Sequence, residues 1–262
     1  MRTTDQTGRT ISLEKTPSRI ISLVPSQTEL LFDLGLEDEV VGITKFCIHP
    51  DSWFHSKTRI GGTKQLNFEK IDALQPDLII ANKEENEKEQ IEALCEKYPV
   101  WISDIKTLDD SYAMITALGE ITDRKVDAKK IVSEIAFRFE NFRKNQTLQH
   151  QRVAYLIWNK PCMVAGHDTF INHLLGVCGF ENVFVDEQSR YPEVTLNDIA
   201  EQKPEIVLLS SEPYPFKEKH IEELKTVLPD AKYFLVDGEL FSWYGSRLMH
   251  STGYFGELLR KL

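Results

Sequence analysis

The sequence predicts an α/β protein made of two similar lobes with mostly parallel sheets, joined by a single long helix. Three observations lead to this prediction. Short runs of Ile, Val and Leu alternate with helical patterns along the chain, as in β/α units around a buried parallel sheet. One pattern of helix and strand occurs twice. A stretch with helical spacing of apolar side chains separates the two copies.

The first β/α unit is predicted at residues 19–35. Residues 19–25 (Arg-Ile-Ile-Ser-Leu-Val-Pro) have the apolar character of a buried strand. Ser26 and Glu29 have the spacing of a capping box, and the leucines that follow continue a helix that we expect to end near Gly35. A strand, a turn and a helix are therefore expected in that order.

The repeated pattern lies at residues 67–80 and 195–208. Each copy starts with a residue that can cap a helix and continues as a short amphipathic helix. Pro and an acidic residue come next, followed by an apolar run typical of a buried strand. A weaker match pairs residues 30–36 with residues 174–180. Two matches in the same order predict two similar β/α lobes.

A connecting helix is expected between residues 123 and 143. Apolar side chains recur there at helical spacing, at Val126, Ile131, Ile135, Phe139 and Phe142. A helix of about 20 residues is about 30 Å long, enough to run along both lobes. Residues 145–150 are expected to form a loop into a strand at 152–158. The predicted N-terminal lobe, connecting helix and C-terminal lobe are residues 1–122, 123–145 and 146–262.

The charge of the chain excludes one large class of partners. Lys and Arg number 31 against 41 Asp and Glu, a net charge of −10, which argues against nucleic acid as a partner. Apolar runs are too short for membrane insertion. Four widely spaced cysteines favour a reduced compartment. No apolar leader follows Met1, so we expect a cytoplasmic location for the chain as written, and a periplasmic or cell-surface location if a leader has been removed.

Common catalytic and metal-binding motifs are missing from the sequence. It has no glycine-rich phosphate loop, no H-E-x-x-H and no G-x-S-x-G. The seven histidines include no pair at i, i+4 spacing that would share a helical face. We therefore expect no dedicated metal site, no intrinsic cofactor and no catalytic residues.

Five segments of the sequence carry a resemblance to a known family: residues 19–29, 41–50, 60–62, 69–81 and 179–184. Together they resemble the class III substrate-binding proteins of ABC importers, and most closely the cobalamin-binding branch, next to the siderophore- and haem-binding branches. The resemblance covers nearly the whole chain. It implies two Rossmann-like lobes joined by one backbone helix, with a corrinoid or related metal chelate held in a cleft between the lobes. It also implies an ABC importer permease as a partner.

Loops that follow strands are the candidate ligand site, because open α/β sheets bind ligands at the carboxyl ends of their strands. Aromatic side chains there would give flat walls, and basic side chains would meet carboxylate or phosphate. The candidates in the N-terminal lobe are Ser26, Gln27, Lys45, Phe46, Cys47, His49, Lys64, Glu84 and Glu85. Those in the C-terminal lobe are Trp158, His167, Arg190, Tyr191, Trp243, Tyr244 and Arg247.

Several of these residues also have a structural interpretation. Ser26 can cap a helix, Phe46 and Cys47 can pack in a core, and His49 can be a hydrogen-bonded structural histidine. The acidic run at residues 84–89 can be a solvated surface. The alternatives at these positions stay open at the level of sequence.

The resemblance is imperfect at the positions that dock onto a permease. In the cobalamin branch each lobe carries an acidic docking residue, and the matching positions here are Lys88 and Ser242. The nearby acids Glu87, Glu89 and Glu239 are the candidate docking residues.

The leading functional hypothesis is a corrinoid-binding protein of an ABC importer. The alternatives are an iron-siderophore or haem binder, a leaderless cytosolic carrier or sensor, and a small-molecule enzyme on the same fold. The enzyme would use His49, Cys47, Glu84 or Glu85 as acid, base or ligand.

Overall fold

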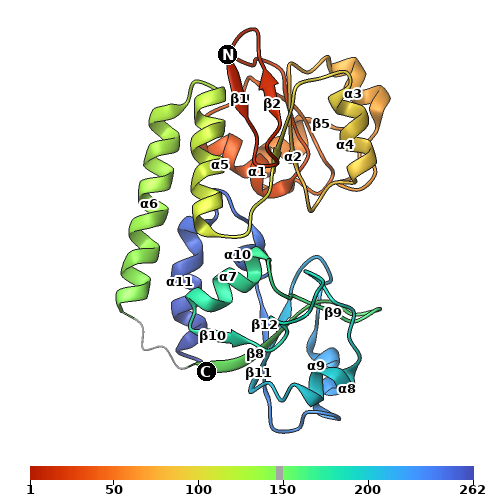
Figure 1. The fold of residues 1–262 in the computed structure, drawn as a ribbon, viewed down its shortest axis with the longest axis vertical. Helices are drawn as coiled ribbons and strands as arrows, with labels where there is room; N and C mark the ends of the chain where they lie inside the picture. The colour runs from red at the N-terminus through yellow and green to blue at the C-terminus, as the bar shows by residue number, and fades with distance from the viewer. Residues whose placement is uncertain (146–149) are drawn as a thin grey trace. The chain divides into compact units, whose positions relative to one another are not determined.

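The structure, a computed structural model, describes residues 1–145 and 150–262 and divides into two compact units (Figure 1). Unit 1 consists of Met1–Ile105, Asp109–Ala136 and Trp243–Met249, and unit 2 of Lys106–Leu108, Phe137–Ser242 and His250–Leu262. Residues 146–149, in the predicted loop 145–150 and at the predicted start of the C-terminal lobe, lie outside the described residues. Residues Trp243–Met249 pack with unit 1, although the predicted C-terminal lobe includes them.

Unit 1 is built on a five-stranded parallel sheet with the strand order β5-β4-β3-β6-β7. The strands are β3 (Ile20–Ser22), β4 (Val40–Ile43), β5 (Thr58–Arg59), β6 (Leu78–Asn82) and β7 (Val100–Ser103). The helices are α1 (Pro25–Asp33), α2 (Asp51–Ser56), α3 (Phe68–Leu74), α4 (Lys88–Cys95) and α5 (Leu108–Ile121). A separate antiparallel pair, β1 (Arg2–Thr4) and β2 (Thr10–Ser12), was not predicted.

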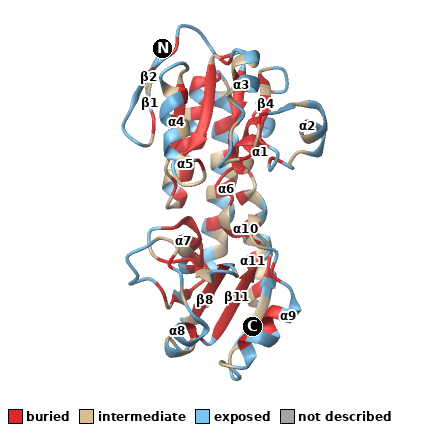
Figure 2. Ribbon diagram, turned by 90° about the vertical axis from the view of Figure 1, so that its right-hand side faces the viewer, coloured by how far each residue is buried: buried red, intermediate tan, exposed pale blue. Residues whose placement is uncertain are grey.

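Unit 2 has a mainly parallel sheet with the order β10-β8-β11-β12, and β9 runs antiparallel to β8. Its strands are β8 (Gln151–Trp158), β9 (Met163–Val164), β10 (Phe180–Asn182), β11 (Ile206–Ser210) and β12 (Lys232–Val236). Its helices are α7 (Phe170–Val177), α8 (Leu196–Glu201), α9 (Glu218–Lys225), α10 (Glu239–Ser242) and α11 (Leu248–Leu259). The central strands β8 and β11 are coloured as largely buried in Figure 2.

The two copies of the repeated pattern form the same structure. Asn67 and Thr195 cap α3 and α8 with their side chains. Asp77 accepts hydrogen bonds from the backbone N–H groups of Ser18 and Arg19, just before β3. Glu205 accepts the corresponding bond from the N–H of Arg152 in β8. In each copy, the acidic side chain that follows the proline therefore fixes the start of the adjacent strand, β3 in unit 1 and β8 in unit 2.

The arginine at each of these strand starts has a second, equivalent role. Arg19 donates its guanidinium hydrogen bonds to the carbonyl of Leu74 at the end of α3. Arg152 donates in the same way to the carbonyl of Gln202 after α8. Basic side chains at a helix C-terminus satisfy carbonyl groups that have no partner within the helix. The predicted repeat of helix and strand is thus confirmed, and its two copies share these kinds of hydrogen bond.

The long helix α6 (Lys125–Lys144) is continuous, and its residues are divided between unit 1 and unit 2. Of the five apolar positions in the predicted pattern, Ile131, Ile135 and Phe139 are buried, Phe142 is half-buried and Val126 is exposed. The predicted fold class, two lobes with mostly parallel sheets and one long helix, is confirmed. In the described part of the chain, no helix is both long and apolar enough to cross a bilayer.

The start of α1 differs from the prediction. The helix begins at Pro25, and Val24 precedes it without any side-chain cap. Proline is favoured at the first helical position because its missing N–H would have no partner there and its φ angle already suits a helix. The capping box predicted at Ser26 and Glu29 is therefore wrong, whereas the end of the helix near Gly35 is confirmed.

Candidate functional site

The candidate site lies at the carboxyl edge of the unit 1 sheet. All five strands are parallel, so the loops that follow them meet at one edge. They include the loops at 44–50, 60–65 and 83–87 and the start of α1. The segment Trp243–Met249, which we call the C-terminal strap, belongs to the same unit and contacts this edge.

Hydrogen bonds fix the C-terminal strap to unit 1 at several points. Arg247 donates from Nε and Nη2 to the two carboxylate oxygens of Glu29 in α1, at 2.8 and 2.7 Å. Ser111 Oγ in α5 donates to the carbonyl of Tyr244 at 2.6 Å. The approach is close, because a Cβ at Gly245 would lie 2.7 Å from the Ser26 carbonyl oxygen. Only glycine permits this contact with α1.

The strap brings aromatic and basic side chains to the edge. The Trp243 ring lies 5.6 Å from the His49 ring in an edge-to-face arrangement. The Arg247 guanidinium lies 4.8 Å from the centre of the Trp243 ring, in cation–π contact. His49, Trp243 and Arg247, all predicted as ligand-binding residues from distant parts of the sequence, are thus brought together.

Tyr244 is buried and donates a hydrogen bond from its hydroxyl to Glu85 Oε1 at 3.0 Å. Burial and the nearby Glu85 carboxylate raise the pKa of this phenol well above its usual value, because both disfavour a phenolate. Tyr244 therefore stays protonated and holds the loop after β6 in place.

The loop after β4 presents two large apolar side chains to solvent, Phe46 and Ile48. Phe46 is 50% exposed, and the Lys45 ammonium lies 5.0 Å from the centre of its ring. Its neighbour Cys47 points inward, with its sulfur 3.0 Å from Thr28 Oγ1 and 3.1 Å from Thr44 Oγ1. Burial raises the pKa of the Cys47 thiol to about 11, so this thiol is a neutral interior group.

Two asparagines that the sequence analysis did not single out shape the loop after β6. Asn82 Oδ1 accepts hydrogen bonds from the N–H groups of Glu84 and Glu85, at 2.8 and 2.9 Å. Asn86 Oδ1 accepts from the Asn82 N–H and so closes the loop on itself. Asparagine at a strand end is a known signal for such turns. Lys64 Nζ donates to the Glu84 carbonyl at 3.1 Å.

Gln27 and Ser26 have interior positions. The Gln27 side chain is fully buried, and its amide nitrogen donates to Ser103 Oγ at 2.6 Å. Ser26 is also buried, in the first turn of α1. The amide of Gln27 connects α1 to the end of β7 and makes no contact at the protein surface.

In unit 2, the predicted residues form two groups: Arg190 lies with its neighbour Tyr191 and with His167 around Asp168, and Trp158 lies elsewhere. Trp158 ends β8, is 37% exposed and contacts the ring of Tyr214, a residue that the sequence analysis did not select. Arg190 and Lys106 both pair with Asp168, and the Lys106 ammonium holds the pKa of that carboxyl below its usual range. His167 is half-buried beside Asp168, and Tyr191 is half-buried beside Arg190.

The candidate docking residues occupy two helix starts. Glu87 precedes α4 and lies 3.4 Å from Lys64 Nζ, and Glu89 is exposed in the first turn of the same helix. Glu239 begins α10 in unit 2, where its N–H donates to Asp237 Oδ1. Lys88 is exposed and pairs with Glu92.

Metal-binding side chains do not cluster in the part of the chain that the structure describes. No three His, Cys, Asp or Glu side chains of those residues are placed to hold an ion. The chemistry offered at the unit 1 edge is instead that of aromatic surfaces, cations and fixed hydrogen-bond donors.

Comparison with known proteins gives consistent results. A model of the periplasmic binding protein family matches residues 20–228. A vitamin B12-binding protein of Photorhabdus laumondii is 27% identical over 201 residues, which are 76% of this chain and 73% of that protein. One from Vibrio cholerae is 27% identical over 194 residues, 73% of this chain and 70% of that protein.

Solved structures show the same fold. The crystal structure of the periplasmic vitamin B12-binding protein of Vibrio cholerae matches with a TM-score of 0.81 at 24% identity, over 94% of this chain and 98% of that chain. A possible iron-binding, periplasmic solute-binding protein from Staphylococcus epidermidis matches with a TM-score of 0.76 at 26% identity, with the same coverage of 94% and 98%. The matched residues include parts of both units.

Proposed function

The chain belongs to the periplasmic binding protein family, and from this premise we propose that it binds a corrinoid or a related metal chelate at the carboxyl edge of the unit 1 sheet. Members of this family are binding proteins rather than enzymes, so the ligand is held and released unchanged. The observation that carries the proposal is the convergence of His49, Trp243 and Arg247 at the ends of parallel strands.

The chemistry of the edge suits a large planar ligand with polar substituents. Phe46 offers a half-exposed aromatic face, and Lys45 beside it offers a cation for carboxylate or phosphate. The similarity to proteins named for vitamin B12 supports a corrinoid. Trp158, His167, Arg190 and Tyr191 of unit 2 remain predicted ligand residues.

Haem is the second candidate ligand. The His49 imidazole beside Trp243 is the kind of nitrogen ligand that binds haem iron. Haem-binding proteins of this fold are among the similar solved structures, with a TM-score of 0.76 for one from Vibrio cholerae.

An ABC importer permease is the proposed partner, and the outer side of the cytoplasmic membrane is the proposed location. The exposed Glu89 and its neighbour Glu87 give unit 1 an acidic helix start, and Glu239 gives one to unit 2. Carboxylates in such positions suit the guanidinium groups of a partner.

A titration tests the proposed ligand class. The protein is titrated with cobalamin, cobinamide and haemin while the fluorescence of its four tryptophans is followed. We expect submicromolar affinity, stronger than about −8 kcal/mol, for the corrinoids. Selective binding of haemin would favour the second candidate, and failure of all three with the fold intact would contradict both.

A substitution tests the place of binding. Phe46→Ala should weaken corrinoid binding by about three- to tenfold, because one aromatic contact is lost. Phe137→Ala is the matched control, since Phe137 is a 61% exposed phenylalanine on α6. Equal affinities of the two variants would place the ligand away from Phe46.

A further inference from the structure

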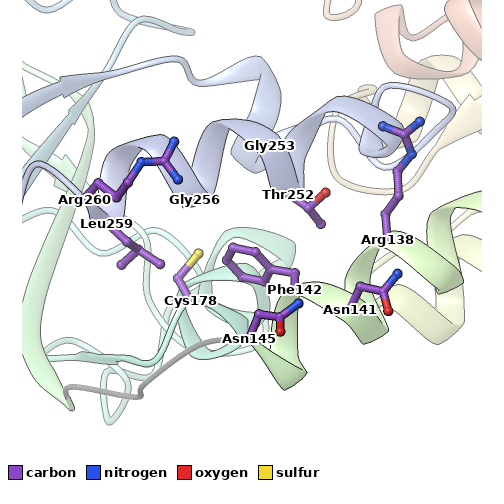
Figure 3. A pocket seen from close by; sticks show the side chains of 10 residues that line it. All are labelled: Arg138, Asn141, Phe142, Asn145, Cys178, Thr252, Gly253, Gly256, Leu259 and Arg260. Atoms are coloured by element: carbon purple, nitrogen blue, oxygen red, sulfur yellow. The ribbon is translucent and has the colours of Figure 1, made fainter.

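Unit 2 contains a groove that is separate from the carboxyl edges of the sheets. It has a volume of about 580 Å³ and lies between the last turns of α6, the end of α7 and one face of α11 (Figure 3). This volume is in the range of small-molecule sites, about 300–1,000 Å³. The lining residues are Arg138, Asn141, Phe142, Asn145, Cys178, Thr252, Gly253, Gly256, Leu259 and Arg260.

The groove is open because α11 carries two glycines on this face. A Cβ at Gly253 would have no atom within 4 Å, and one at Gly256 would have only Arg260 Nη1, at 3.7 Å. A Cβ would therefore fit at either position and would also strengthen the helix, since glycine lowers helix stability relative to alanine. The two glycines leave the backbone of α11 accessible over one turn.

The floor of the groove is largely apolar. The ring of Phe142 lies 6.0 Å from that of Phe255 in α11, so its position is fixed by packing. Leu259 adds an aliphatic surface. Cys178 is only 4% exposed, and burial raises the pKa of its thiol, so the sulfur is neutral. Figure 3 shows the Cys178 sulfur and the Phe142 ring between the two helices.

The charge of the lining is positive, although the chain has a net charge of −10. Among the ten lining residues, Arg138 and Arg260 are cations and none is acidic. In Figure 3 the two guanidinium groups lie toward opposite ends of the groove. A guanidinium group matches a carboxylate in shape and charge, and the amides of Asn141 and Asn145 add donors along the side.

We propose that this groove is a second ligand site of the protein, and that its ligand is an amphipathic carboxylate. The hydrocarbon part lies over Gly253 and Gly256 against Phe142 and Leu259, and the carboxylate pairs with Arg260. This site is independent of the chelate site proposed for unit 1, because it shares no residue with it.

The probes are dodecanoate and dodecanol, which share a chain length and differ in the charged group. Calorimetric titration of the whole protein should show one saturable dodecanoate site and at least tenfold weaker binding of dodecanol. Absence of saturable dodecanoate binding would overturn the proposal. So would binding of many equivalents without saturation, which indicates nonspecific adsorption.

Two pairs of variants locate the site. Gly253→Phe fills the groove and should weaken dodecanoate binding at least thirtyfold, while its Tm stays equal to or above that of the original chain. Ala93→Phe, at an exposed position of α4 in unit 1, is the matched control and should leave binding unchanged. Because Gly253→Phe does not destabilise the helix, lost binding cannot be attributed to unfolding.

The second pair tests the charge. Arg260→Met should weaken dodecanoate binding at least tenfold and leave dodecanol binding unchanged. Arg143→Met is the control, because it removes an exposed charge of α6 that does not line the groove. It should change the binding of neither ligand. Dodecanoate affinities within twofold of the original for both Gly253→Phe and Arg260→Met would overturn the proposal. Cobinamide binding, measured in parallel, reports separately on the unit 1 site.

Discussion

Tyr98 donates a hydrogen bond from its hydroxyl to Asp72 Oδ1 at 2.6 Å, and Lys97 lies 3.1 Å from the other oxygen of this carboxylate. The bond from Tyr98, followed by that from Lys97, lowers the pKa of Asp72. The same bond raises the pKa of Tyr98 to about 12. Each side chain therefore favours the ionisation state in which the pair is bonded.

This pair predicts how stability depends on pH. The Asp72 contribution is fully present above the ordinary pKa of 3.8 and is lost as the pH falls through the lower value of the folded state. The Tyr98 contribution is present below 10 and is lost as the pH rises toward 12. Tyr98→Phe should therefore lower Tm at pH 7, with a difference from the original chain that shrinks below pH 4 and above pH 10.

Tyr233→Phe is the control for that experiment. The Tyr233 hydroxyl donates to the carbonyl of Leu228 at 2.6 Å, and a carbonyl does not titrate. The change in Tm caused by Tyr233→Phe should therefore stay constant between pH 3 and 7. A Tyr98→Phe effect that also stays constant over this range would contradict the role given to Asp72.

Single residues show where prediction from sequence ends. The loops that meet at the unit 1 edge were predicted correctly, because a buried apolar run identifies a strand and the loop follows it. The direction of a side chain within the loop is not encoded in that pattern. Phe46 points to solvent and Cys47 points into the interior, although they are adjacent.

At the level of elements, the repeat offers a quantitative comparison. Asp77 accepts backbone hydrogen bonds from both Ser18 and Arg19, whereas Glu205 accepts one from Arg152. A hydrogen bond contributes about 1 kcal/mol net to stability, and these bonds lie at exposed positions. Asp77→Ala should therefore lower the free energy of unfolding by about 2 kcal/mol and Glu205→Ala by about 1 kcal/mol.

Urea unfolding of the two variants tests this comparison. Asp230→Ala, an exposed position between α9 and β12, should change the free energy of unfolding by less than about 0.5 kcal/mol. An equal loss in the free energy of unfolding for Glu205→Ala and Asp77→Ala would contradict the comparison. The number of backbone hydrogen bonds would then not determine how much each carboxylate stabilises the protein.

Elements with strong periodicity were predicted well, and short ones were not. The helix α6 and the strands β6 and β11 follow from long or fully apolar patterns. The pair β1 and β2 and the antiparallel strand β9 have two or three residues each, too few for alternation to be recognised. The start of α1 was misplaced because Ser-x-x-Glu also occurs inside helices that begin with proline.

For the whole molecule, the two proposed ligands should act on different units. Bound cobinamide should slow hydrogen exchange in the loops at 44–50 and 83–87 of unit 1, where the chelate site is proposed. Dodecanoate should slow exchange in residues 138–145 and 252–260, which include the groove. Exchange is the suitable measurement because binding raises the free energy of local opening.

Two outcomes distinguish the sites in that measurement. Protection of separate peptides by the two ligands would agree with two sites. Protection of the same peptides by both would mean that dodecanoate binds at the chelate site and not in the groove. Dodecanol at the same concentration controls for effects of a hydrocarbon chain alone.

The two-lobed organisation could be predicted because the sequence repeats itself, but the composition of unit 1 could not. Trp243 and Tyr244 follow α10 of unit 2 directly. Because they are close to α10 in sequence, they were predicted to belong to the C-terminal lobe. Their true neighbours, His49 and Glu85, are far away in the chain. Contacts of this kind come from tertiary packing, which periodicity does not report.

The C-terminal strap also has a consequence for biosynthesis. Ribosomes make proteins from the N-terminus, and N-terminal domains generally fold first, while the rest is still being translated. Here the last piece of unit 1 is residues Trp243–Met249, which follow residues Phe137–Ser242 of unit 2 in the chain. Until Arg247 leaves the ribosome, Glu29 lacks the guanidinium that it binds in the finished protein. Unit 1 is therefore completed only after residues Phe137–Ser242 of unit 2 have been translated.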